Sequence, residues 1–96
     1  MSESFTVKIV DEGRSGSVTY SEGAMALALW WEFTTDGAYV WAPAPEQWDG
    51  YWRSNGAPDA AGRRDEILAR VAAETKRQRA SSARISIGDD GISLKF

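Results

Sequence analysis

Four aromatic side chains gather between residues 41 and 52, and their types suit the recognition of a partner. Tryptophan and tyrosine are enriched in binding hot spots because each combines a large rigid surface with a polar group. A small protein without cysteine also uses such rings to build its core, and we expect this use for Trp31 and for at least one of Trp48 and Trp52. The predicted binding site consists of Trp41, Trp48, Tyr51, Trp52 and Arg53.

A second candidate surface is basic. Residues 63–84 carry seven basic and three acidic side chains, whereas residues 1–62 carry three basic and nine acidic ones. Arg63, Arg70 and Arg77 are spaced by seven, so on a helix they form one stripe that could face a charged partner. The phosphates of a nucleic acid are one such partner, but the net charge of −3 argues against it. The simplest interpretation is a solvated helix face.

Catalytic chemistry is restricted because the chain has neither cysteine nor histidine. Thiol catalysis and disulfides are excluded, and the commonest metal ligand and acid–base group are missing. An enzyme would have to use carboxylates, such as Glu46 with Asp49 or Asp89 with Asp90. Acid pairs are common on surfaces, and the second pair is typical of a turn. We predict no catalytic residue, metal or cofactor; enzymatic activity stays open, with a non-enzymatic role favoured.

One small folded unit must position these side chains. The chain has 96 residues, of which 43% are hydrophobic and 26% charged, as in ordinary globular proteins. No segment approaches the ~18 apolar residues that cross a bilayer, and the N-terminus lacks the pattern of a secretion signal. We therefore expect a single domain over residues 1–96 that is soluble, cytoplasmic and without membrane contact.

Alternating apolar and polar residues predict about six strands arranged in hairpins. The predicted strands are residues 5–9, 17–21, 24–33, 39–42, 85–87 and 92–96.

Residues 24–33 are the ambiguous segment because they are almost wholly apolar and could also form a helix. That helix would be apolar on every side and would leave no face for water. As a strand, its large side chains point one way, and the alanines with Trp30 point the other way. We predict a strand with a flat, thinly covered alanine face that invites a partner.

Two helices are predicted between the strands. Pro45 suits the first position of a short helix near residues 45–52. A long helix over about residues 59–80 has a capping aspartate at its start and an apolar stripe that includes Val71. The fold class is therefore α+β: an antiparallel or mixed sheet with the long helix packed on its face of large side chains.

These observations favour a small protein-binding or regulatory module of unidentified partner, with an immunity-like protein as one form. The alternatives are a nucleic-acid-binding protein that uses the arginine-rich helix and a small enzyme that uses carboxylates. We also expect a weak homodimer, because the alanine face with Trp30 and the oppositely charged regions are self-complementary.

Overall fold

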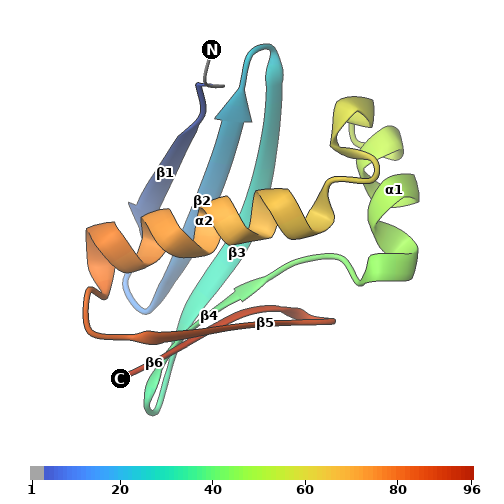
Figure 1. The fold of residues 1–96 in the computed structure, drawn as a ribbon. Helices are drawn as coiled ribbons and strands as arrows, with labels where there is room; N and C mark the ends of the chain where they lie inside the picture. The colour runs from blue at the N-terminus through green and yellow to red at the C-terminus, as the bar shows by residue number, and fades with distance from the viewer. Residues whose placement is uncertain (1–3) are drawn as a thin grey trace.

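Three hairpins build one six-stranded antiparallel sheet (Figure 1), as the sequence predicted. The computed structural model describes residues 4–96. The strands are β1 (Thr6–Asp11), β2 (Ser15–Glu22), β3 (Met25–Thr34), β4 (Gly37–Trp41), β5 (Arg84–Gly88) and β6 (Gly91–Lys95). Their order in the sheet is β1-β2-β3-β4-β6-β5, so the last hairpin joins through β6 and leaves β1 and β5 at the edges.

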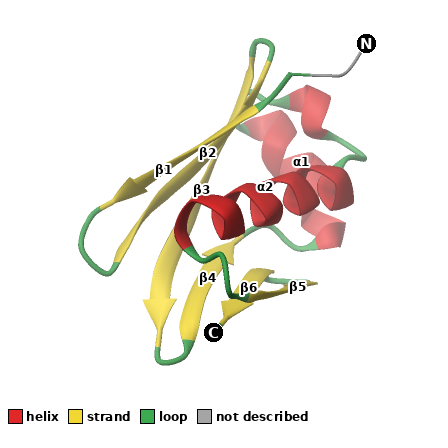
Figure 2. Cartoon of the chain, turned by 60° about the vertical axis from the view of Figure 1, so that its left-hand side comes forward, coloured by secondary structure: helices red, strands yellow, loops and turns green. Residues whose placement is uncertain are grey.

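The helices all lie between β4 and β5 in the chain. They are α1 (Pro45–Ser54), the short 3-10 helix η1 (Pro58–Ala60) and α2 (Arg64–Arg79). Figures 1 and 2 show α2 crossing one face of the sheet and α1 standing beside it. Within the described residues, no helix has the length and apolarity needed to cross a bilayer.

The long helix begins later than the predicted residue 59. Asp59 lies inside η1, and Gly62 follows with a φ of +73°, a conformation that other residues rarely adopt. This turn separates η1 from α2, whose N-cap position is Arg63 without a side-chain capping bond. The short helix ends at Ser54, two residues beyond the predicted end.

The ambiguous apolar segment forms strand β3, as predicted. Its side chains alternate along the strand: Met25, Leu27, Leu29 and Trp31 are buried, whereas Ala26, Ala28 and Trp30 are exposed. The buried set faces α2, and the exposed set faces away from it. Strand geometry thus sorts this apolar run into one core face and one free face.

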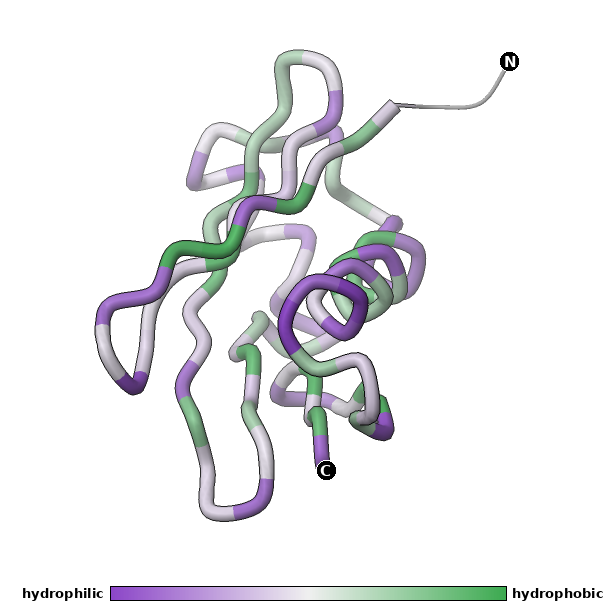
Figure 3. Tube along the Cα trace, turned by 90° about the vertical axis from the view of Figure 1, so that its left-hand side faces the viewer, coloured by the Kyte–Doolittle hydropathy of each residue, from purple (hydrophilic) through white to green (hydrophobic). Residues whose placement is uncertain are grey.

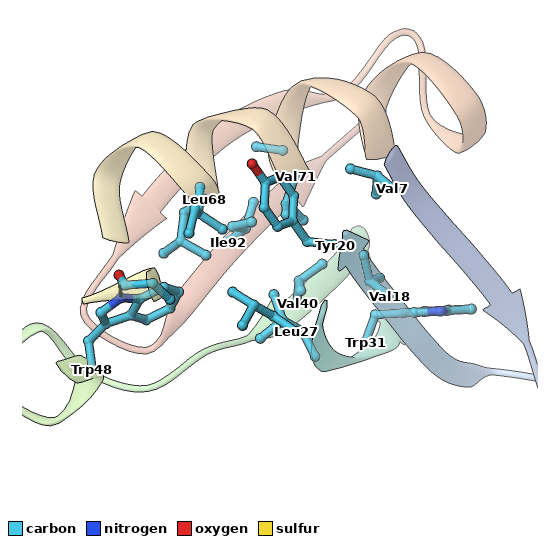
Figure 4. Packing of buried hydrophobic residues seen from close by; sticks show 14 of the residues in the cluster. Val7, Val18, Tyr20, Leu27, Trp31, Val40, Trp48, Leu68, Val71 and Ile92 are labelled. Atoms are coloured by element: carbon cyan, nitrogen blue, oxygen red, sulfur yellow. Dashed lines mark hydrogen bonds between the residues drawn. The ribbon is translucent and has the colours of Figure 1, made fainter. Parts of the chain in front are cut away.

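The core fills the space between α2 and the sheet (Figure 4). Leu68 and Val71 of α2 are fully buried and lie above Tyr20, Leu27 and Ile92 of the sheet. Hydrophilic residues lie instead at the turn of the β3–β4 hairpin (Figure 3). The predicted packing of the apolar helix stripe on the face of large side chains is confirmed.

Arg64 ties three segments together at the start of α2. Its side chain is buried, and its guanidinium donates hydrogen bonds to the carbonyl oxygens of Pro43 (2.9 Å), Gly88 (2.7 Å) and Asp89 (3.0 Å). A buried cation needs such acceptors to offset its lost hydration. Arg64 thereby fixes the path of the chain between β4 and α1 and the tip of the β5–β6 hairpin.

Candidate functional site

The face of the sheet turned away from α2, here the outer face, carries two exposed tryptophans side by side. Trp30 of β3 and Trp41 of β4 are directly opposite in the strand register. Their side chains remain 46% and 44% exposed, respectively. Cross-strand partners lie close enough to act as one surface. A contiguous exposed pair of the largest apolar side chains is a recognised sign of an interaction site.

A groove runs between these tryptophans and α1. Its volume is about 480 Å³, and its walls come from β2, β3, β4, α1 and the connection before α1. We name it the aromatic groove, and its main lining residues are Ala28, Trp30, Trp41, Gln47, Tyr51 and Trp52. The groove therefore combines the small side chain of Ala28 with the exposed rings of Trp30, Trp41 and Tyr51.

Buried tryptophans in α1 set the orientation of the exposed ring beside them. Trp48 and Trp52, four residues apart, share the buried face of the helix and pack edge to face with ring centroids 5.5 Å apart. The indole Nε1 of Trp48 donates a hydrogen bond to the carbonyl oxygen of Ala60 at 2.8 Å. Because this face is fixed in the core, Tyr51 is directed outward at the groove.

The two buried indoles differ in their hydrogen bonding. Nε1 of Trp52 is buried and has no hydrogen-bond partner among residues 4–96, whereas Nε1 of Trp48 is paired. An unpaired buried donor costs roughly 1–3 kcal/mol. The unpaired indole N–H of Trp52 in the groove wall therefore lowers the stability of the chain.

A carboxylate orients one of the exposed rings. Nε1 of Trp41 donates to Oε1 of Glu32 at 2.9 Å, and the ring of Tyr39 lies 4.5 Å from that of Trp41, centroid to centroid. In the described part of the chain, Glu32 forms no ion pair with a basic side chain. The outer face thus presents an acidic group that is held against an indole but is not neutralised.

The predicted aromatic site divides into core and surface. Trp41 and Tyr51 are exposed at the groove, whereas Trp48 and Trp52 are buried, with Trp52 forming part of its wall. The side chain of Arg53 is exposed and forms no ion pair with the described residues.

The predicted site omitted Trp30, Glu32 and Gln47. The alternation in residues 24–33 did place Trp30 on the exposed face. Trp30 is far in sequence from the aromatic cluster. Its pairing with Trp41 could not be predicted, because it depends on the register of β3 with β4.

The predicted arginine stripe is engaged within the chain. Arg63 pairs with Glu22 at 2.7 Å and with Glu66 at 2.9 Å, and Arg70 pairs with the same two carboxylates at 3.2 Å and 2.9 Å. The guanidinium of Arg70 also lies 4.7 Å from the centre of the Phe5 ring. Both arginines therefore fasten α2 to the end of β2.

The pKa of the Glu22 carboxyl is lowered, chiefly because the Tyr20 hydroxyl donates a hydrogen bond to it at 2.6 Å. The hydrogen bond from Arg63 is the second cause. Burial raises the pKa of the Tyr20 hydroxyl, so it remains a donor at neutral pH. Because the folded-state pKa of Glu22 is depressed, its stabilising effect is present at neutral pH. That effect is lost as the pH falls through the lowered pKa.

Arg77, the third residue of the stripe, pairs with Glu74 at 2.7 Å and is the most exposed of the three. Nucleic-acid phosphates would have to displace a carboxylate from each of the three arginines. This cost offsets the free energy that counterion release contributes to nucleic-acid binding. We therefore predict no gel shift of duplex DNA by micromolar protein at about 0.15 M salt. A shift that disappears when Arg70→Glu and Arg77→Glu are combined would contradict this interpretation of the stripe.

A second cavity, of about 330 Å³, lies between the C-terminal end of α2 and the sheet. Its lining is mostly apolar and includes Phe33 and Phe96, while Arg79 at its rim pairs with Asp11 at 2.8 Å. Thr75 also lines it, and its hydroxyl oxygen is buried without a hydrogen-bond partner among the described residues. The charges of this cavity are mutually satisfied, so it offers a weaker anchor for a partner than the aromatic groove.

Known proteins add no assignment to this geometry. Comparisons with protein-family models, curated proteins and solved structures find no match for the chain. Across residues 4–96, no three acidic side chains come together in a group that could hold a metal ion. Function is therefore inferred from the residues of the groove.

Proposed function

We propose that this protein is a protein-binding module and that the aromatic groove receives a partner segment bearing arginine or lysine. The observation that carries the proposal is the directly opposed, half-exposed pair of Trp30 and Trp41, with the Glu32 carboxylate held against the second indole. Hot spots of protein interfaces are enriched in tryptophan, tyrosine and arginine, and they tend to face one another.

The shape of the groove supports a polypeptide partner. Trp30 and Trp41 offer a broad flat surface on the sheet, and Tyr51 stands on the opposite wall in α1. Gln47 adds a side-chain amide that can both donate and accept hydrogen bonds. An extended segment that lies between the sheet and α1 can contact aromatic rings on both sides and still satisfy its backbone groups.

Charge supports a cationic segment. The elements around the groove span residues 15–54, which hold five acidic and one basic side chain, a net charge of −4. A guanidinium or ammonium group over a tryptophan gains about 0.5–2 kcal/mol from the negative face of the ring. Glu32 stands beside Trp41 to pair with such a group. A polyanionic partner would meet repulsion at the same place.

A regulatory role follows from this chemistry. A small acidic protein that covers a basic surface of its partner blocks whatever that surface binds. An immunity-like or other inhibitory role is the form of regulation that we propose.

The first test measures binding of fluorescent Gly-Ser peptides that carry spaced arginines, lysines or glutamates. We expect the arginine peptide to bind and the glutamate peptide not to bind. Trp30→Ala and Trp41→Ala should each weaken binding of the arginine peptide about tenfold, in line with a lost hot-spot contact. Fluorescence anisotropy gives the dissociation constants.

Phe33→Ala is the matched control for this test. Phe33 lies on the same strand as Trp30, is 48% exposed, and points to the other face of the sheet. Its loss should leave peptide binding unchanged. Equal binding of arginine and glutamate peptides, or equal weakening by Phe33→Ala and Trp30→Ala, would refute the proposed site.

A further inference from the structure

The two edges of the sheet are treated differently by the rest of the chain. At the β1 edge, the C-terminal end of α2 reaches over the strand. Nε2 of Gln78 donates to the carbonyl oxygen of Val7 at 3.1 Å, and Arg79 pairs with Asp11 at 2.8 Å. Edge strands expose unpaired backbone groups that can template another strand, so side chains that cover them prevent pairing. The β1 edge is covered in this way.

The β5 edge is open. All five of its residues are exposed, including Ile85 and Ile87. Among the described residues, the side-chain hydrogen bond to the backbone of β5 is that of Arg64, at Gly88 next to the turn. The strand contains neither the proline nor the lysine that commonly protects an edge, and its one charged residue, Arg84, stands at its start. The middle of β5 can therefore accept a further strand.

The sequence of β5 suits pairing with itself. In the order Arg-Ile-Ser-Ile-Gly, the two isoleucines flank Ser86 symmetrically. If two copies pair antiparallel about this serine, Ile85 of one copy lies opposite Ile87 of the other, and the reverse pair follows by symmetry. Both isoleucines lie on the face of the sheet that carries α2, since Ile87 pairs with the buried Ile92 and Ile85 with the buried Leu94. All four isoleucines would then share one apolar strip.

Charge complementarity favours the same register. Arg84 would lie opposite Gly88 of the second copy, beside its Asp89 and Asp90. None of these three charged side chains forms an ion pair within residues 4–96. A Cβ on Gly88 would meet no atom of residues 4–96 within 4 Å, so among these residues the space beside Gly88 is open. The twofold symmetry brings each arginine to the aspartates of the other copy.

We propose that a second copy of this chain is the partner of β5, so that two six-stranded sheets join into one continuous sheet. This interface is separate from the aromatic groove. It is also separate from the alanine face, which the sequence analysis predicted as the site of self-association. Only five residues per copy pair, so the interface falls below the roughly 1,200–2,000 Å² of a standard stable complex. The dimer is accordingly a weak one that forms at micromolar or higher concentration.

Sedimentation velocity over a concentration series tests this dimer. The weight-average mass should rise from that of one chain toward that of two, whereas Ile87→Lys should remain monomeric throughout the series. Val10→Lys is the matched control on the covered β1 edge, since Val10 is 37% and Ile87 39% exposed. This control should dimerise like the unmodified chain. A chain that is monomeric throughout the micromolar to millimolar range overturns the proposal, as does equal loss of dimer in both variants.

A charge exchange tests the register. Arg84→Asp should weaken dimerisation about tenfold, and adding Asp89→Arg in the same chain should restore it, because the pairs re-form with reversed sign. Dimerisation that is indifferent to Arg84→Asp, or that is not recovered in the double variant, overturns the antiparallel pairing about Ser86. Peptide binding at the aromatic groove should be unchanged in these variants, so the two proposals can fail separately.

Discussion

Val71→Asp should lower the free energy of unfolding by about 3–5 kcal/mol, because it buries an unpaired charge between α2 and the sheet. Val71 is fully buried and lies near Tyr20 among the apolar residues of the core (Figure 4). Urea denaturation followed by circular dichroism measures the change. A loss of this size would remove a large part of the stability of a small protein.

The exposed residue Ala73 of the same helix provides the control for Val71. Ala73→Asp should lower the free energy of unfolding by less than about 1 kcal/mol, the size of a helix-propensity difference. Similar midpoints for the two aspartate variants would mean that α2 does not pack on the sheet through Val71.

Trp48→Ala should lower the free energy of unfolding by about 3–5 kcal/mol, whereas Trp41→Ala should lower it by less than about 1 kcal/mol. Trp48 is fully buried and donates its indole hydrogen bond to Ala60, so its loss leaves a cavity and an unpaired carbonyl. Trp41 is half exposed on the outer face. Thermal and urea unfolding of the two variants would measure this division of the tryptophans between core and surface.

The opposite ranking would contradict that division. If Trp41→Ala destabilised the protein more than Trp48→Ala, the outer face would be part of the core, and the aromatic groove could not be a binding surface. The Trp48 variant need not fold for the comparison to be informative, because Trp41→Ala alone distinguishes a surface ring from a core ring.

The strands were predictable because their alternation is local. In β3, side chains of different size point to opposite faces, and an all-apolar helix would have had no solvated side. The alternation therefore predicted the strand, its core face and the exposed position of Trp30. The start of α2 was less predictable, since Asp59 is a good capping residue and only the positive φ of Gly62 separates η1 from α2.

The aromatic site was only partly predictable because burial depends on tertiary contacts. On α1, Trp48 and Trp52 share a face with Tyr51 by sequence spacing, but the helix buries the two tryptophans and exposes the tyrosine. The pairing of Trp30 with Trp41 required the β3–β4 register. The sequence therefore predicted the residue types of the site, but not which of these residues lie together in the groove.

The role of the arginines depended equally on distant partners. Arg63 and Arg70 form a stripe by their spacing, but Glu22, on β2, accepts hydrogen bonds from both. Arg64, beside the stripe in sequence, is the buried one and binds backbone carbonyls. Charge counts along the chain cannot distinguish these uses.

The most direct test of the proposed function is a ¹H–¹⁵N NMR titration of the indole N–H resonances with the spaced-arginine peptide. Each of the five tryptophans contributes one such resonance. Binding in the aromatic groove should shift the resonances of Trp30 and Trp41 and leave that of Trp48 unchanged, because the last is buried and paired with Ala60. Saturating peptide that leaves the Trp30 and Trp41 resonances in place would contradict the proposal that this face binds a cationic partner.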